Sequence, residues 1–182
     1  MKLFALLIFL ISGISNAAPN PWSTLDGCSY VPHSNNDGDS FHVRCGDDAF
    51  VLRLYFVDTP ETNLQYPERT REQAEHFGAT LDDTLKAGAQ ARVFVRDTLK
   101  GPFTVVTRKA TAAGRGKELR YYAMVHVGGK NLDEILVLQG LARAKGVAAS
   151  VPGEKSRAHS QRLQLLEDEA KQKGRGLWAR KK

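Results

Sequence analysis

Apolar and polar residues alternate between residues 23 and 57, which is the pattern of short strands with one buried face. Turn-forming residues interrupt this alternation at 35–39 and at 46–48. We therefore expect three strands, at residues 28–33, 40–44 and 50–57. Pro60 ends the last of them, because proline offers no backbone N–H to a neighbouring strand. Closely spaced strands of this kind are typical of a small antiparallel barrel.

The second half of the chain predicts two further strands and two helices, and it leaves one segment open. β-Branched residues indicate a strand at 103–107, and renewed alternation indicates another at 120–127. Helices are expected at 131–140 and at about 160–173, because each stretch carries apolar residues at helical spacing and ends at a glycine. Residues 89–100 fit either a strand or a helical stripe. Residues 62–87 are polar and predict a charged surface helix or loop.

Residues 1–17 differ from the rest of the chain. A lysine is followed by an apolar run over 3–11 and by the small-residue sequence Ser15-Asn16-Ala17. This arrangement is typical of a secretory signal peptide, and it is too short for a membrane span. A buried N-terminal helix is the alternative interpretation. We expect cleavage near Ala17, export to the periplasm or the extracellular space, and no stable membrane association afterwards. The remaining residues, 18–182, have the composition of one globular domain.

The two cysteines, Cys28 and Cys45, flank the turn that contains Asp37. In an antiparallel hairpin they would lie on facing strands, where a disulfide can form. The oxidising compartment expected for an exported protein favours this bridge over the alternative of two buried free thiols. No Cys or His partners stand at the spacing of a zinc site, so the pair predicts a disulfide rather than a metal centre.

The chain has a formal net charge of +6 and a pI of about 9.4, which favours association with polyanions. Two groups of acidic residues stand out in this basic chain. Asp37 and Asp39 lie in a turn. Asp58 and Glu61 follow the third expected strand, which contains Arg53. Taken separately, such acids could be turn formers and the arginine a surface residue. Together, carboxylates among surplus cations indicate a divalent metal that receives a phosphate.

Three motifs carry a resemblance to a known family. They are Asp-Gly-Asp-Ser at 37–40, an arginine five residues before the Asp of Asp-Thr-Pro-Glu at 58–61, and Gln-Gly-Leu-Ala at 139–142. With these motifs the chain resembles the staphylococcal nuclease family over about residues 24–178. The resemblance implies an α+β fold, with a five-stranded Greek-key barrel of the oligonucleotide-binding (OB-fold) type and about three helices. It also implies a calcium-dependent nuclease that acts on DNA and RNA, and a helix at 89–100.

The resemblance also assigns roles to individual residues. The set that it implies for Ca²⁺ is Asp39, Asp58, the backbone carbonyl of Thr59 and, as an outer-shell acid, Asp37. Two carboxylates and one carbonyl leave positions for water and for a substrate oxygen, which suits catalysis. Glu61 corresponds to the acid that activates the attacking water.

Two arginines are expected to clamp the phosphate, because the guanidinium fork matches two phosphate oxygens. Arg53 corresponds to the first of them. For the second, Arg120 and Arg115 are both candidates. Arg120 is favoured, because Arg115 would require five extra residues inside the following strand.

The chain departs from the family pattern at a few places. Glu118 and Gly146 stand where the family has aromatic residues, so base or sugar stacking lacks its usual partners there. Residues 62–87 form a longer segment than the family's mobile loop, and an additional helix is expected within it. None of these changes touches the expected metal ligands.

The sequence thus predicts an exported, monomeric nuclease whose partners are DNA and RNA. A domain of the same fold that binds nucleic acid without cleaving it is the alternative. The retained acids and arginines favour the enzyme, because a non-catalytic copy should lack some of them. A third alternative, an exported protein that calcium merely stabilises, would not be retained on immobilised DNA.

Overall fold

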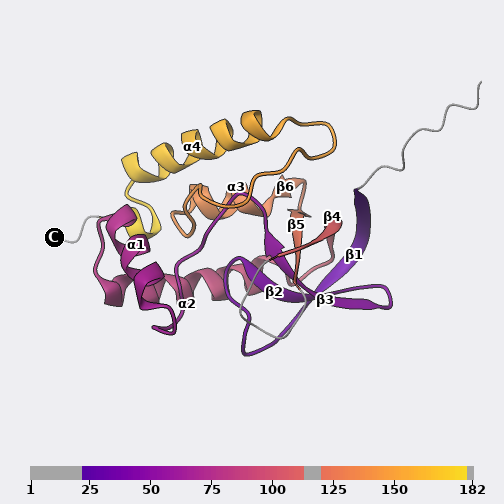
Figure 1. Cartoon of the computed structure of the whole chain (residues 1–182), viewed down its shortest axis with the longest axis horizontal. Helices are drawn as coiled ribbons and strands as arrows, with labels where there is room; N and C mark the ends of the chain where they lie inside the picture. Colours follow the sequence, from indigo (N-terminus) through magenta and orange to yellow (C-terminus); the bar gives the residue numbers. More distant parts are fainter. Residues whose placement is uncertain (1–21, 113–119, 180–182) are drawn as a thin grey trace, which may run out of the picture.

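The computed structural model describes residues 22–112 and 120–179 (Figure 1). Within these ranges the elements are β1 (Ser23–Val31), β2 (Ser40–Cys45), β3 (Asp48–Leu54), α1 (Pro67–Phe77), α2 (Leu81–Thr98), β4 (Phe103–Thr111), β5 (Arg120–Val127), β6 (Lys130–Asn131), α3 (Leu132–Leu138), α4 (Ser156–Gln172) and the short 3-10 helix η1 (Gly176–Trp178). The expected signal peptide at residues 1–17 lies outside the described residues, as do Arg115 and Glu118.

The strands form one sheet that closes into a ring. Their order is β3-β2-β1-β4-β5-β6 with antiparallel neighbours, and β3 also pairs with β5 in parallel, which completes the barrel. This closure places Arg53 of β3 beside Tyr122 of β5, and Val51 beside Arg120. The α+β class and the OB-fold-type barrel predicted from the sequence are therefore confirmed. The additional helix expected within residues 62–87 is α1.

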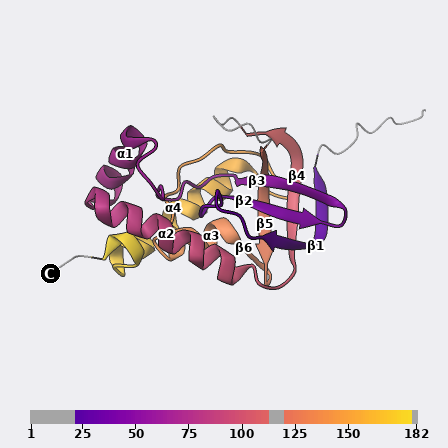
Figure 2. The ribbon, with the colours of Figure 1, turned by 90° about the horizontal axis from the view of Figure 1, so that it is seen from below.

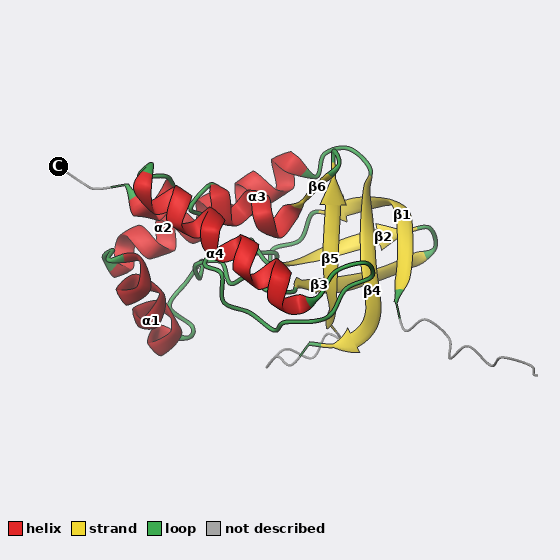
Figure 3. Cartoon of the chain, turned by 90° about the horizontal axis from the view of Figure 1, so that it is seen from above, coloured by secondary structure: helices red, strands yellow, loops and turns green. Residues whose placement is uncertain are grey.

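The strands gather at one end of the molecule and the helices at the other (Figure 3). α1 packs on α2, and α3 contacts both α4 and β5. Apolar side chains of the strands and helices share one buried core, whose members include Phe41, Leu52, Val95, Leu136 and Leu163. Burial of each such side chain contributes roughly 1.5–3 kcal/mol relative to leaving it exposed. None of the helices within the described ranges is long and apolar enough to cross a membrane.

Helix α2 covers most of residues 89–100, the segment whose pattern fitted both a strand and a helix, but it begins earlier, at Leu81, and ends at Thr98. Thr80 caps its start, because its side-chain oxygen accepts a hydrogen bond from the Asp83 N–H at 3.1 Å. The helix runs between α1 and the barrel (Figure 2). A Cβ added at Gly88 would lie 2.2 Å from the carbonyl oxygen of Glu61. Glycine thus lets α2 lie directly against the loop that carries Glu61.

Strand β3 ends at Leu54, earlier than the expected end at residue 57. Tyr55 still bonds to β5, but Phe56 has a φ of 65°, in the left-handed region. The Phe56 N–H then donates to the carbonyl of Val147 at 3.0 Å instead of continuing the ladder. This bend turns the acidic residues that follow into a loop at the edge of the barrel.

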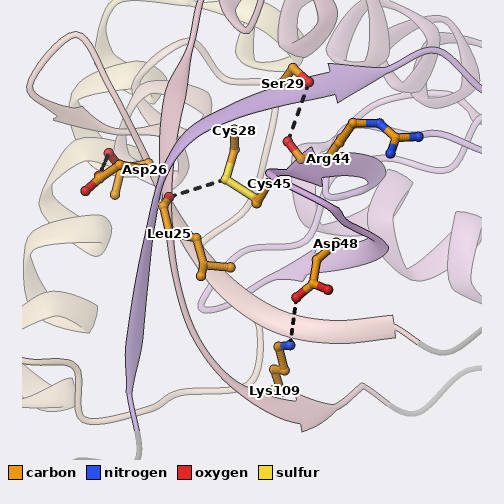
Figure 4. The surroundings of a disulfide bond; sticks show 9 residues. Leu25, Asp26, Cys28, Ser29, Arg44, Cys45, Asp48 and Lys109 are labelled. Carbon is orange, nitrogen blue, oxygen red and sulfur yellow. Dashed lines mark hydrogen bonds and ion pairs between the residues drawn. A yellow bond between two sulfur atoms is a disulfide. The ribbon is translucent and has the colours of Figure 1, made fainter.

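Cys28 and Cys45 form a disulfide between β1 and β2 (Figure 4). Their Cα atoms lie 4.2 Å apart, and the adjacent pair Ser29 and Arg44 face each other in the register of the two strands. The predicted bridge is therefore confirmed. It closes the segment that contains the acidic turn at 37–40.

Candidate functional site

Two acidic loops meet at the edge of the barrel. Asp39 lies in the turn before β2 and Asp58 in the loop after β3, and they are only 1% and 5% exposed. Arg53 of β3 joins them, because its Nη1 contacts Asp39 Oδ1 and its Nη2 lies 3.0 Å from Asp58 Oδ1. The structure thus brings three of the expected site residues together around one guanidinium.

The turn that carries Asp39 is held by a neighbouring carboxylate. Asp37 Oδ1 accepts hydrogen bonds from the backbone N–H groups of Asp39 and Ser40, at 2.9 and 2.6 Å. Burial and the nearby charge of Asp39 raise the pKa of Asp37 well above its ordinary value. A Cβ on Gly38 would lie 2.8 Å from Thr59 Cγ2, so the turn packs directly against the second loop. In this arrangement the Asp37 side chain shapes the loop that presents Asp39.

The carboxylate of Asp58 is surrounded by three guanidinium groups. Oδ1 accepts from Arg53 and Arg69, and Oδ2 lies 2.8 Å from both Nε and Nη2 of Arg143. Burial alone would raise the pKa of Asp58, but the charges of Arg69 and Arg53 hold it below its ordinary value. The sequence did not single out Arg69 or Arg143. Arg143 carried one usable signal, because it directly follows the Gln-Gly-Leu-Ala motif.

A glutamine of α1, Gln73, binds three residues of the second loop. Its Nε2 donates to Asp58 Oδ2 and to the Thr59 carbonyl, each at 2.9 Å, and its Oε1 accepts from the Glu61 N–H at 2.9 Å. The residue is fully buried, and a buried amide is tolerated only when its polar atoms are paired. Sequence reasoning missed Gln73, because a polar residue in a charged helix gives no sign of the loop that it contacts.

Glu61 lies beside the same helix with its side chain 16% exposed. Arg69 Nε lies 2.9 Å from Glu61 Oε1. Burial raises the pKa of Glu61, the charge of Arg69 offsets this only in part, and Asp39 and Asp58 raise it further. A carboxylate with a raised pKa is better suited to accept a proton near neutral pH.

A cavity of about 380 Å³ opens beside these acids and is strongly cationic. Its charged lining consists of Arg53, Arg69, Arg120, Arg143, Lys145 and the acid Asp58. Arg120 also lies near the acidic turn, with its Nη1 3.4 Å from Ser40 Oγ. Of the two candidates for the second phosphate clamp, the structure places Arg120 at the site, while Arg115 lies outside the described residues. An excess of guanidinium groups around one cavity indicates an anionic ligand.

Gly146, where the resemblance leads us to expect an aromatic residue, is required by close packing. A Cβ on Gly146 would lie 2.7 Å from the carbonyl carbon of Phe56 and from the backbone nitrogen of Val57. No larger side chain fits there, so stacking from this position is excluded. The cavity instead has an aromatic wall from Tyr122, whose ring stacks on Tyr55 with centroids 4.9 Å apart.

The two loops offer the oxygen atoms that a hard divalent cation prefers. Asp39 and Asp58 already bracket a cationic group, the Arg53 guanidinium, and the Thr59 carbonyl has a lone pair beyond the one that Gln73 uses. In their chemistry these donors fit a hard cation such as Ca²⁺, and two carboxylates with one carbonyl would leave positions for water. Within residues 22–112 and 120–179, no three His, Cys, Asp or Glu side chains form a group that could hold a metal ion. The fit therefore depends on two carboxylates and a carbonyl.

Comparison with protein families gives a match that covers most of the chain. A family model described as a staphylococcal nuclease homologue matches residues 51–180. The matched range begins within β3 and contains Arg53, Asp58, Glu61 and Arg120. Asp39 precedes this range, so its position at the site comes from the structure alone.

Proposed function

Because the chain belongs to the staphylococcal nuclease family, we propose that it is a calcium-dependent, sugar-nonspecific nuclease that hydrolyses phosphodiester bonds of DNA and RNA. Membership itself supports a nuclease-like or nucleic-acid-binding role. The observation that favours catalysis is the Arg53 guanidinium, which joins the buried carboxylates of Asp39 and Asp58 at the wall of a cationic cavity. A surface that only binds nucleic acid gains nothing from buried acids at its centre, because they repel phosphate.

Asp39, Asp58 and the carbonyl of Thr59 would hold the Ca²⁺ ion, with Asp37 supporting the turn. The chemistry that the ion supplies when bound is polarisation of a phosphoryl oxygen, which reduces the repulsion that an attacking hydroxide meets. The Thr59 N–H already donates to Asp39 Oδ2 at 2.7 Å, and Gln73 donates to Asp58. Both carboxylates are therefore oriented in advance, which lowers the cost of binding a cation.

Arg53 and Arg120 would clamp the phosphate that is cleaved. Their guanidinium groups line one cavity, and each fork can bind two phosphate oxygens and stabilise the charge that grows as water attacks. Glu61 would orient or deprotonate that water, since its raised pKa makes it a stronger base. Loss of one such charged contact typically lowers the rate roughly 10²–10³-fold.

The protein would act in the periplasm or outside the cell. The Cys28–Cys45 disulfide supports this compartment, because such bonds persist in oxidising surroundings. The signal-peptide pattern at residues 1–17 supports it as well. Amino-terminal sequencing of the exported protein should start near Ala18, and a sequence that still starts at Met1 would contradict cleavage.

The substrate range is tested with labelled single-stranded DNA and RNA of the same base sequence, incubated with the purified protein and Ca²⁺. Cleavage of both at comparable rates is expected, because the proposed contacts involve phosphate and ion rather than the sugar. Cleavage of neither, with both still bound, would contradict the nuclease and favour a non-catalytic nucleic-acid-binding module.

A further inference from the structure

Helix α1 reaches the site from the polar segment that is longer than the family's loop. Pro67 lies in its first turn, and Gly78 ends it in the left-handed conformation. Arg69 and Gln73 stand four residues apart and therefore project from the same face of the helix. The three hydrogen bonds of the buried Gln73 anchor this face to the loop after β3. The anchor places Arg69 at the wall of the cavity.

Arg69 is paired with acids that have other roles in the proposed function. Its Nη2 contacts Asp58, and its Nε lies 2.9 Å from Glu61 Oε1. The Arg69 side chain is 39% exposed, compared with 15% for Arg53 and 4% for Arg143. Among these three guanidinium groups, Arg69 can therefore turn into the cavity with the least repacking.

The charge balance of the site gives this motion a physical reason. Ion pairs join three carboxylates to three guanidinium groups, namely Asp39, Asp58 and Glu61 with Arg53, Arg69 and Arg143. A divalent cation adds two positive charges at the same oxygen atoms, where it repels the guanidinium groups already present. A displaced guanidinium then needs a new anion, and a phosphate in the adjacent cavity supplies one.

We propose that Arg69 is a third substrate-binding arginine, which leaves Asp58 and Glu61 when a divalent cation binds and then contacts a phosphate of the nucleic acid. This inference rests on the proposed function and adds to it a residue of α1. Arg69 would compete with Ca²⁺ before the substrate arrives and would support the substrate once Ca²⁺ is bound. A residue that served only as a counter-ion for the acids would compete with Ca²⁺ but would not contribute to substrate binding.

Isothermal titration calorimetry on the exported protein separates the two effects. Ca²⁺ is titrated alone, and thymidine 5′-monophosphate, which has no diester bond to hydrolyse, is then titrated at saturating Ca²⁺. Arg69→Gln should bind Ca²⁺ several-fold more tightly, because a competing cation is gone. It should bind the nucleotide about 10-fold more weakly, because a charge-assisted hydrogen-bond donor is lost. Thymidine, which lacks the phosphate, should bind to the wild type and to Arg69→Gln with the same affinity.

The matched control is Arg71→Gln on the same helix. Arg71 is 55% exposed and pairs with Glu68, away from the site, so both affinities should stay at the wild-type values. Arg69→Lys keeps the charge without the fork, and it should also weaken nucleotide binding. If the circular dichroism spectrum of Arg69→Gln differs from that of the wild type, the nucleotide affinity of Arg69→Lys tests the inference instead.

Two outcomes would overturn the inference while leaving the proposed function intact. One is tighter Ca²⁺ binding with unchanged nucleotide binding, which would make Arg69 a counter-ion only. The other is equal behaviour of the Arg69 and Arg71 variants. Binding of neither Ca²⁺ nor the nucleotide by the wild-type protein would contradict the proposed function and this inference together.

Discussion

The side-chain nitrogen of Gln73 lies 2.9 Å from the carbonyl oxygen of Thr59. Because Gln73 is fully buried and belongs to α1, this contact fixes the loop after β3 from a separate element. The carbonyl in question is one of the expected metal ligands. The loop is therefore positioned by the protein itself, before any ligand binds.

Gln73→Met should destabilise the protein by about 1–3 kcal/mol, because the Glu61 N–H and the carbonyl of the buried Thr59 lose their partner. Urea unfolding measures this change. Gln164→Met on the exposed face of α4 is the matched control, and it should stay within about 0.5 kcal/mol of the wild type. Equal stability of the two variants would mean that the Gln73 contacts do not hold the loop.

Arg120→Ala should lower kcat at least ~10²-fold, because Arg120 opens β5 and its strand pre-positions the guanidinium at the cavity that Arg53 also lines. Lysine at this position should not restore the rate, since an ammonium group lacks the planar fork. Arg115→Ala should mainly raise KM, by less than ~10-fold. Steady-state kinetics on a labelled oligonucleotide distinguish these effects. A larger loss of kcat in the Arg115 variant would transfer the second clamp to Arg115.

Much of the barrel could be predicted, because most strands carry their own local pattern. The strand expected at 40–44 is β2, and the one at 120–127 is β5. β1 begins at Ser23, earlier than the expected residue 28, because its first residues are mostly exposed and only Leu25 among residues 23–27 is a large apolar side chain. They pair with β4 nonetheless, as Thr24 does with Val106. Backbone pairing of exposed residues cannot be predicted from the pattern of apolar positions.

The candidate site could be predicted only where a motif carried it. Arg53, Asp39 and Asp58 stand in recognisable sequences, and the structure brings their side chains together. Gln73 and Arg69 could be assigned to a charged helix but not to the site. Their role depends on the packing of α1 against the loop after β3, and this tertiary contact is not encoded in the periodicity of either segment.

Reduction of the Cys28–Cys45 disulfide should destabilise the exported protein by about 3 kcal/mol, because the bridge closes a loop with a sequence separation of 17 residues. Urea unfolding with and without a reductant measures the difference. A Cys28→Ala, Cys45→Ala double variant is the control, and it should not respond to the reductant. Mass spectrometry in which both cysteines are alkylated without prior reduction would contradict the bridge.

His159 should make stability depend on pH near neutrality. It is fully buried, with its Nδ1 3.0 Å from Glu154 and its Nε2 in contact with Asp133 and with its ring against Phe56. Burial and the nearby charge of Arg162 would lower the pKa of His159. The hydrogen bond and charge of Asp133, together with the hydrogen bond to Glu154, outweigh these two effects, so the pKa is raised.

A raised pKa in the folded state means that this contribution to stability is complete below the unfolded value of 6.5 and is lost as the pH rises through the folded value. Unfolding free energies measured as a function of pH should therefore decline above pH 6.5 in the wild type, and this part of the decline should be absent in His159→Gln. Glu154 acts in the opposite direction, because its hydrogen bond from Arg162 lowers the pKa of Glu154 to about 2. Parallel curves for the two proteins above pH 6.5 would contradict the assignment.

The central claim is that Asp39 and Asp58 hold a Ca²⁺ ion without which the protein does not cleave nucleic acid. The most direct test is the initial rate of cleavage of an end-labelled DNA oligonucleotide as a function of free Ca²⁺, with circular dichroism recorded on the same samples. We expect no detectable cleavage in excess chelator, a saturable rise with Ca²⁺ and an unchanged fold throughout. Undiminished cleavage in excess chelator would contradict the claim.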